Sequence, residues 1–598
     1  MWLLPLSCLL WTRAAATEIQ RPNIVFIVAD DLGWDDVSYH GSDEIMTPNI
    51  DTLAYQGVIL DQYYTDSEGS ASRSALFTGK YPMRMGLQGV SIRASEDRGI
   101  PVSELLLPVR LRELGYKTHL VGKWGVGKSR AHYLPTNRGF DSFYGFTGDS
   151  VDYLTYNTVE ELNGTSFYGL DFFENLDAVE DKSGYLTDII TDKAVDVIRN
   201  HNTSVPLYLH LSHATPHIGG GLVSLQPPLD SVEANKHIVH SARRLYAGLV
   251  TTLDNSVGNI IAVLAERDIL QNTIIVFVSD NGAPTLGAKK NFGSNYPLRG
   301  TKGSPWEGGV RSIGLVWHAA IMPRIHHGLI HATDWLPTLV SAAGGRVNNN
   351  IDGINQWSVL INNLIPKRRN ALITIDDLNG WAAFREGDFK IIIGDVNPDL
   401  SRHYGNEFKR GRSMKESLIF YDDILLASEA ARVFKEILQL PLDVISISDR
   451  RADLNLTLYN QNSKEKAFCL PTKAKGCLFN ISSDPTESND LWTMFPDVVR
   501  RMSLRLRTLW TELKARRQPQ SDPRADPSLR NYTWYEWIKN EELNLESPPL
   551  PVFPMYASLG EMQYLVDLNF NLLTDKLNVY IGNVKETISQ SVSKLFYN

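Results

Sequence analysis

The chain has 598 residues, of which 43% are hydrophobic and 21% are charged, and its formal net charge is −9. This length exceeds what one ordinary hydrophobic core holds, so we expect two domains. The negative charge argues against a nucleic-acid-binding protein, because such proteins carry a basic face. A small anionic ligand stays possible, since a local group of Arg, Lys and metal can outweigh the net charge.

The first residues form a short apolar segment, 1–11, followed by small residues up to Ala16. This pattern predicts a secretory signal peptide over residues 1–16, although the basic start of such a peptide is missing. A buried N-terminal helix is the alternative, and we favour it less because a strand is predicted shortly afterwards. No later stretch is apolar over the length of a bilayer, so we expect no transmembrane segment.

Continuous β-branched apolar runs predict strands buried on both faces at residues 24–29 and 273–278. A third strand is predicted at 207–211, and apolar residues at helical spacing predict a helix from about Ser241 to Glu266. Strands that alternate with helices indicate an α/β domain with a mostly parallel sheet. Ligand sites in such domains lie at the carboxyl ends of the strands.

The α/β pattern covers residues 17–394, and we expect a smaller C-terminal α+β domain over 395–545. The Pro-rich residues that follow predict a linker and tail over 546–598. Cys469 and Cys477 are close in sequence, and in an exported protein such a pair predicts a disulfide. Asn-x-Ser/Thr sequons predict N-glycosylation in the secretory pathway, and they begin at Asn163, Asn202, Asn455, Asn480 and Asn531.

Polar pairs follow two of the predicted strands. Asp30 and Asp31 follow the strand at 24–29, and Asp280 and Asn281 follow the strand at 273–278. Either pair alone is more often an ordinary turn sequence. Both pairs in one α/β domain offer three carboxylates and an amide oxygen, which are the ligands that a hard cation such as Ca²⁺ prefers.

The segment from Asp66 to Lys80 reads Asp-Ser-Glu-Gly-Ser-Ala-Ser-Arg-Ser-Ala-Leu-Phe-Thr-Gly-Lys. It resembles the active-site loop of the sulfatase family, in which Cys (or Ser)-x-Pro-Ser-Arg precedes x-x-Leu-x-Thr-Gly. The resemblance extends over roughly residues 20–500 and is nearest to the arylsulfatase B-like (N-acetylgalactosamine-4-sulfatase-like) branch. Other segments that carry it are 21–25, 47–51, 122–124, 134–141, 306–311, 478–481 and 484–487.

The resemblance implies a sulfatase/alkaline-phosphatase-like α/β fold with a mostly parallel sheet, one calcium ion, and hydrolysis of sulfuric esters of sugars or aryl groups. Lysine and arginine suit the sulfate group of such an ester, because they bind tetrahedral oxyanions well. The positions that match the family's functional residues are Asp30, Asp31, Asp280 and Asn281 for the metal, Arg73 for the formylglycine, and Lys123 and Lys302 for the sulfate. A family histidine matches His217, with His213 as the alternative and Thr215 in a gapless alignment.

Two departures from the family pattern concern residues that carry its chemistry. Gly69 stands where the family has the Cys or Ser that becomes formylglycine, and Gly125 stands where the Gly-Lys-Trp-His pattern has histidine. Glycine has no β-carbon, so Gly69 can become neither an aldehyde nor an alkoxide. Ser70 offers a neighbouring hydroxyl, but we expect it to cap the following helix.

These observations predict a secreted or lysosomal sulfatase-family protein that has lost formylglycine-dependent catalysis. One alternative is a non-catalytic, calcium-dependent binder of sulfated glycans. Another is residual esterase activity that uses Ser70 or a metal-bound water.

Overall fold

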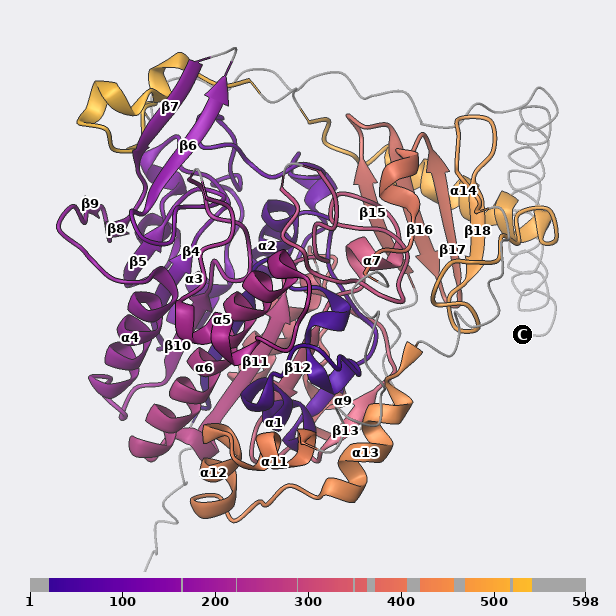
Figure 1. Ribbon diagram of the computed structural model, residues 1–598. Coiled ribbons are helices and arrows are strands. Elements are labelled where there is room, and N and C mark those ends of the chain that lie inside the picture. Colours follow the sequence, from indigo (N-terminus) through magenta and orange to yellow (C-terminus); the bar gives the residue numbers. More distant parts are fainter. Residues whose placement is uncertain are drawn as a thin grey trace, which may run out of the picture.

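The structure is a computed structural model that describes residues 21–539, except 163–164, 222, 288, 348–349, 363–370, 406–419, 457–467 and 517–519 (Figure 1). The predicted signal peptide, the sequon at Asn163 and the predicted linker and tail lie outside the described residues. Of the other sequon asparagines, Asn202 and Asn531 are exposed, and Asn455 and Asn480 are half-buried.

A ten-stranded sheet forms the centre of the protein. In its middle, β1 (Asn23–Ala29) pairs in parallel with β10 (Leu207–Ser212) and β11 (Thr273–Ser279), which confirms the three predicted strands. The sheet order is β13-β2-β12-β11-β1-β10-β4-β5-β8-β9. The other strands are β2 (Val58–Leu60), β4 (Lys117–Lys123), β5 (Ser142–Phe146), β8 (Phe173–Glu174), β9 (Asp177–Ala178), β12 (Gly314–Trp317) and β13 (Arg324–His326).

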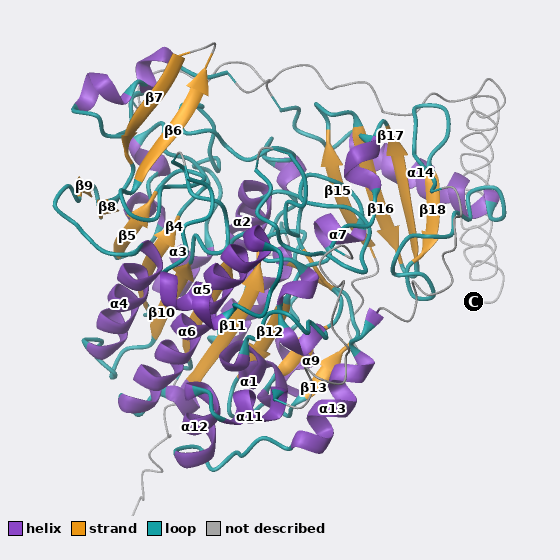
Figure 2. Ribbon diagram, in the orientation of Figure 1, coloured by secondary structure: helices purple, strands orange, loops and turns teal. Residues whose placement is uncertain are grey.

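Helices cover both faces of this sheet (Figure 2). Val25 and Ile27 of β1 point into one core, and Ile24 and Phe26 point into the other, as the twofold repeat of a strand requires. The first core contains α1 (Pro48–Gln56), α4 (Leu186–Arg199) and α6 (Ser241–Glu266). The second contains α2 (Gly69–Thr78), α3 (Leu107–Glu113) and α8 (Trp335–Ala342). The predicted α/β fold class is confirmed.

Helix α6 confirms the helix predicted at 241–266. Among the described residues it is the one helix long and apolar enough to cross a membrane, and 78% of its apolar stretch is buried in the protein. Its composition therefore fits its place beneath α1, α4 and α5 (Leu229–Ala234) in the core. From the sequence we expected no apolar stretch of this length. The stretch is possible in a core helix because a helix covered on most sides needs little polar surface.

A four-stranded antiparallel sheet forms a second, smaller unit. It contains β15 (Ala371–Asp376), β16 (Trp381–Glu386), β17 (Phe389–Gly394) and β18 (Cys477–Asn480), and α14 (Pro496–Trp510) packs against it. The predicted disulfide between Cys469 and Cys477 is present at the start of β18. Three of the four strands precede the boundary predicted at residue 394, so that division falls inside one sheet.

Residues after 394 also return to the large sheet. Helix α12 (Glu429–Glu436) packs on α6 and α1, and Tyr421 of α11 (Tyr421–Leu426) donates a hydrogen bond to the Asp51 carboxylate at 2.6 Å. The remaining elements are β3 (Tyr63–Tyr64), β6 (Asn157–Leu162), β7 (Thr165–Leu170), β14 (Ile330–His331), α7 (Glu307–Val310), α9 (Trp357–Asn362) and α13 (Val444–Asp453).

A buried ionic group joins the two sheets. Lys390 of β17 lies 2.8 Å from Glu307 Oε1 of α7 and 2.9 Å from Glu487 Oε1, and all three side chains are at most 3% exposed. Glu487 Oε2 also accepts a hydrogen bond from the Glu307 amide at 2.7 Å. The lysine thus compensates two carboxylates that burial would otherwise destabilise.

Replacing this lysine should therefore destabilise the whole protein. We expect Lys390→Met to lower the free energy of unfolding by about 3–5 kcal/mol, because it leaves the buried Glu487 without its cation and Glu307 with Arg311 alone within 4.0 Å. Urea unfolding would measure the change. Lys236→Met is the control, since its ion pair with Glu233 is about 70% exposed on both sides and should contribute little. Similar losses in both variants would contradict the role given to Lys390.

Candidate functional site

The two predicted metal pairs meet at the carboxyl edge of the large sheet. Ala29 of β1 lies opposite Ser279 of β11, so Asp30 and Asp280 follow at the same level. The Asp31 amide donates to Asp280 Oδ1 at 3.1 Å, and Asn281 Nδ2 donates to Asp31 Oδ1 at 2.6 Å. Asp31 has φ = 67°, a left-handed conformation that is uncommon for a residue other than glycine.

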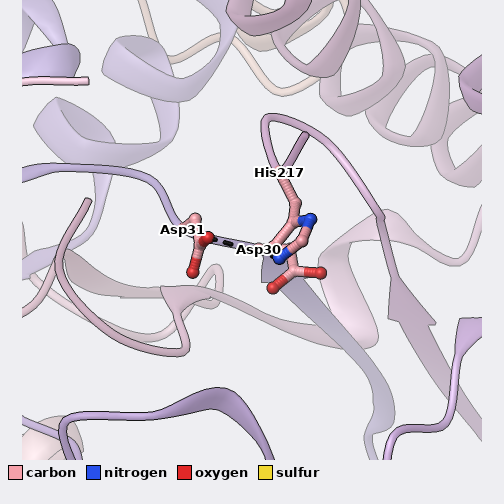
Figure 3. Close-up of side chains that lie close together, drawn as sticks. All are labelled: Asp30, Asp31 and His217. Carbon is pink, nitrogen blue, oxygen red and sulfur yellow. Dashed lines mark ion pairs between the residues drawn. The ribbon is translucent and has the colours of Figure 1, made fainter. Parts of the chain in front are cut away.

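His217 joins this group from the loop after β10 (Figure 3). One ligand atom each of Asp30, Asp31 and His217 lies within 4.8 Å of the others, and His217 Nε2 is 3.5 Å from Asp31 Oδ2. His213 instead contacts Ser256 Oγ of α6 at 2.9 Å. Thr215 bonds the Thr187 hydroxyl at 2.7 Å. Of the three candidates from the sequence, His217 is the one brought to the aspartates.

The side-chain oxygens of this group fit a divalent cation. Asp30 Oδ1, Asp31 Oδ2 and Asn281 Oδ1 are buried and accept no hydrogen bond among the described residues. Buried polar atoms of this kind are costly unless something satisfies them. A hard cation takes carboxylate and amide oxygens, so it would satisfy all three. His217 as a further nitrogen ligand is a possibility that the sequence analysis missed.

Three buried cations surround these carboxylates. Arg73 of α2 lies 3.0 Å from Asp280 Oδ2, Lys123 lies 2.8 Å from Asp30 Oδ2, and Lys302 lies 2.6 Å from Asp31 Oδ1. Burial raises the pKa of Asp280 and the nearby Asp30 raises it further, whereas Arg73 lowers it. The three predicted cationic residues therefore come together, although they belong to segments far apart in the chain.

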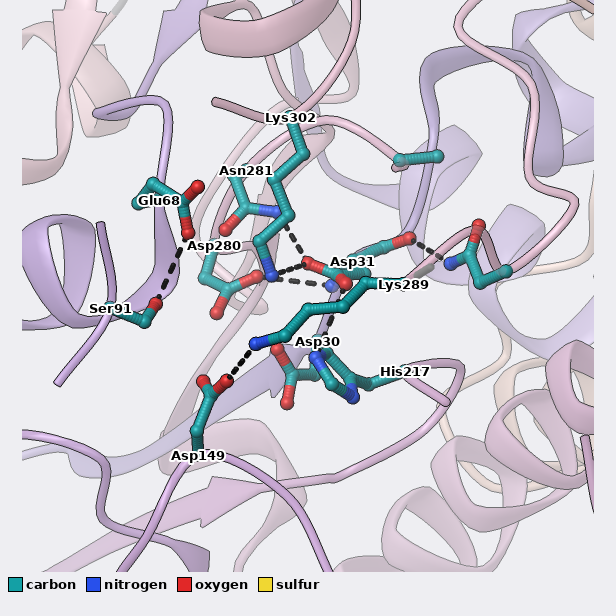
Figure 4. Close-up of polar contacts among 12 residues, drawn as sticks. Asp30, Asp31, Glu68, Ser91, Asp149, His217, Asp280, Asn281, Lys289 and Lys302 are labelled. Carbon is teal, nitrogen blue, oxygen red and sulfur yellow. Dashed lines mark hydrogen bonds and ion pairs between the residues drawn. The ribbon is translucent and has the colours of Figure 1, made fainter. Parts of the chain in front are cut away.

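The structure adds a further carboxylate–lysine pair, Asp149 and Lys289 (Figure 4). Asp149 follows β5; its Oδ1 lies 3.1 Å from Lys123 Nζ and its Oδ2 lies 2.9 Å from Lys289 Nζ. Burial raises the pKa of Asp149, but Lys123 and Lys289 outweigh it and hold that pKa well below its usual range. Neither residue lies in a recognisable motif, so no sequence pattern predicts this pair.

The two glycine departures lie tightly against the same charges, and a β-carbon at position 69 would require the Asp280 carboxylate to shift. Gly69 is the first residue of α2, and a β-carbon there would lie 2.8 Å from Asp280 Oδ2 and 3.6 Å from Asn281 Oδ1. Gly125 has φ = 70°, and a β-carbon there would lie 3.1 Å from Lys123 Cε and 3.6 Å from Arg73 Cδ. Position 125 thus has a backbone that favours glycine.

Ser70 does not cap α2, contrary to the expectation from the sequence. The N-cap position belongs to Glu68, and Ser70 is the second residue of the helix. The Ser70 hydroxyl donates to the Gly125 carbonyl at 2.7 Å and accepts from the Ile92 amide at 3.0 Å. These bonds fasten α2 to two loops and engage the Ser70 hydroxyl as both donor and acceptor.

The sequence and fold of the chain are similar to those of known sulfatases. The family profile described as Sulfatase matches residues 22–345. The chain is 32% identical over 544 residues to arylsulfatase J of Mus musculus, covering 90% of this chain and 83% of that protein. It is 30% identical over 422 residues to N-acetylgalactosamine-6-sulfatase of Rattus norvegicus, and the match covers 64% of this chain and 77% of that protein. A solved structure described as Ps i-CgsB in complex with k-i-k-neocarrahexaose has a TM-score of 0.61 at 25% identity. The match covers 82% of this chain and 93% of that chain.

The sheet topology and its charged carboxyl edge define an α/β protein with the sulfatase fold. The chain belongs to the sulfatase family. The nearer resemblance to the arylsulfatase B-like branch stays a prediction.

Calcium should stabilise the protein through the group described above. We expect added Ca²⁺ to raise the melting temperature, because an ion that binds only the folded state stabilises it, by about 2.7 kcal/mol at a hundred times its dissociation constant. Asp31→Asn should abolish this shift, and chelation should reverse it in the wild type. Asp395→Asn, at an aspartate that is 57% exposed in its ion pair with Lys473, is the control and should keep the shift. An undiminished shift in Asp31→Asn would place the ion elsewhere.

Proposed function

We propose that this protein binds sulfated glycans with the help of a divalent cation, Ca²⁺ in our assignment, and has lost formylglycine-dependent hydrolysis of sulfuric esters. One observation carries the proposal. At position 69 no side chain extends toward Asp280 and Asn281. The cationic side chains around that position, and the buried oxygens suited to a metal ion, are all present. In this assignment Asp30, Asp31, Asp280 and Asn281 hold the metal.

The buried lysines supply the binding of the anion. A lysine ammonium has three N–H donors, of which Lys302 directs one to Asp31 and Lys123 directs two to Asp30 and Asp149. Burial lowers the pKa of Lys302, but Asp31 and Glu68 outweigh it and raise that pKa well above its usual value. Lys302 therefore stays charged, and donors on both lysines remain for a sulfate.

Hydrolysis needs more than a bound sulfate. The metal would polarise the sulfate oxygens, and Arg73, Lys123 and Lys302 would stabilise negative charge. The step that breaks the S–O bond also requires a nucleophile next to the sulfur, and Gly69 offers no atom for it. The bound ester accordingly stays intact in this proposal.

Residual esterase activity is the alternative. Ser70 would need to release both hydrogen bonds of its hydroxyl and turn toward the sulfate, and a nucleophile out of position loses much of the rate. A water at the metal remains as another nucleophile. Turnover is therefore measured together with binding in the test below.

A sulfated sugar is the ligand class that the relatives favour. One relative is named for N-acetylgalactosamine, and one structural neighbour is described with a bound neocarrahexaose. We place the protein in the secretory pathway, secreted or lysosomal. The disulfide between Cys469 and Cys477 supports this placement, because disulfides persist in oxidising compartments.

Binding and turnover are measured on the same purified protein. We expect titration calorimetry with N-acetylgalactosamine monosulfate to show calcium-dependent binding, and a fluorogenic aryl sulfate to show no turnover above that of Asp280→Ala. Asp280→Ala should also lose the binding, because it removes a metal ligand and the partner of Arg73. Turnover that Asp280→Ala abolishes would mean that another nucleophile operates. Absence of both binding and turnover would refute the proposal.

Restoring the side chain at position 69 should restore chemistry. We expect Gly69→Cys, produced in cells that make formylglycine, to gain aryl-sulfate turnover by at least about 10²-fold over background, since covalent catalysis then regains its nucleophile. Gly69→Ala is the matched control, because it introduces the same β-carbon near Asp280 without a thiol. Equal activity in the two variants would show that the loss at residue 69 is not what limits turnover.

A further inference from the structure

We propose that Lys289 selects among sulfated sugars by pairing with a second anionic group of the ligand, beside the sulfate that the buried cations hold. This inference rests on the proposed function and adds a residue to it that lies in no family motif of the sequence. The ligand class it implies is a sugar with two anionic substituents.

Lys289 is more exposed to solvent than the other lysines of the site. Its side chain is 61% exposed, whereas Lys302 is 6% exposed and Lys123 is fully buried. It extends from the loop after β11, and in Figure 4 its side chain reaches toward Asp149 beside the group of Asp30, Asp31 and His217. A ligand whose sulfate reaches the buried lysines would therefore bring its neighbouring substituents to Lys289.

Lys289 can leave Asp149 without removing the only cation beside that carboxylate. Asp149 keeps Lys123 on its other oxygen at 3.1 Å, so its charge stays compensated without Lys289. Solvent screens the pair on the side of Lys289, which is 61% exposed, although Asp149 itself is 14% exposed. The lysine side chain is long and flexible, so its ammonium can move from one anion to another.

A ligand group that takes Lys289 has to compete with carboxylates for its ammonium. Asp149 and Glu68 attract its ammonium, and Lys302 repels it. A sugar hydroxyl does not compete with a carboxylate for an ammonium group, because hydrogen bonds between ionised partners are the stronger ones. A carboxylate or a second sulfate on the sugar does compete. The exposed lysine is thus suited to distinguish a dianionic sugar from a monoanionic one.

The test compares two ligands in calcium buffer: N-acetylgalactosamine that carries one sulfate and the same sugar that carries two. We expect the wild type to prefer the disulfate, and Lys289→Ala to weaken disulfate binding by at least about threefold while monosulfate binding stays the same. Lys290→Ala is the control, because this neighbouring lysine lies over the Phe292 ring at 4.7 Å; it should leave both affinities unchanged. Circular dichroism would verify that both variants fold.

The other outcomes are separable. If Lys289→Ala weakens neither sugar, or weakens both equally, the selective role of Lys289 is refuted while the proposed function stands. If Lys290→Ala reproduces the loss, the effect belongs to surface charge in general and the proposal fails. If the wild type binds neither sugar, the proposed function itself fails, and this inference fails with it.

Discussion

The parallel pairing of β1 with β11 is the constraint on which the site depends. It places the Asp30 and Asp280 carboxylates side by side at a buried edge, where like charges repel and water is excluded. Such a pair persists only with cations close by, and Arg73, Lys123 and Lys302 provide them from separate segments. The charge balance at the edge therefore fixes how α2 and the loops after β4 and β11 fold onto the sheet.

The same balance explains how a nucleophile can be lost while the site survives. The side chain at position 69 is not needed to compensate any carboxylate, because Arg73 holds Asp280 directly. The cations, in contrast, are needed for the fold as well as for an anion. Selection for a stable protein alone would thus retain these cations, and the proposed binding function would use a site that the fold already maintains.

Much of this could be predicted from the sequence, since strands buried on both faces and their terminal acidic pairs are local patterns. The sequence favoured His217 for the family histidine but left His213 and Thr215 open, because the path of the loop after β10 has no local signal. The Asp149–Lys289 pair depends on two loops meeting in space. The predicted boundary at residue 394 separated β17 from β18, because strand pairing between distant segments leaves no local signal.

The pairing of β17 with β18 has a consequence for biosynthesis. Strand β17 ends at Gly394, but its partner begins only at Cys477. While the intervening segment emerges from the ribosome, the apolar edge Phe389–Gly394 has no neighbour on that side, and an open edge of this kind invites pairing with other chains. The nascent protein therefore passes through a period in which this edge is open to pairing with other chains. Closure by the late strand ends that period and brings Cys477 to its disulfide partner.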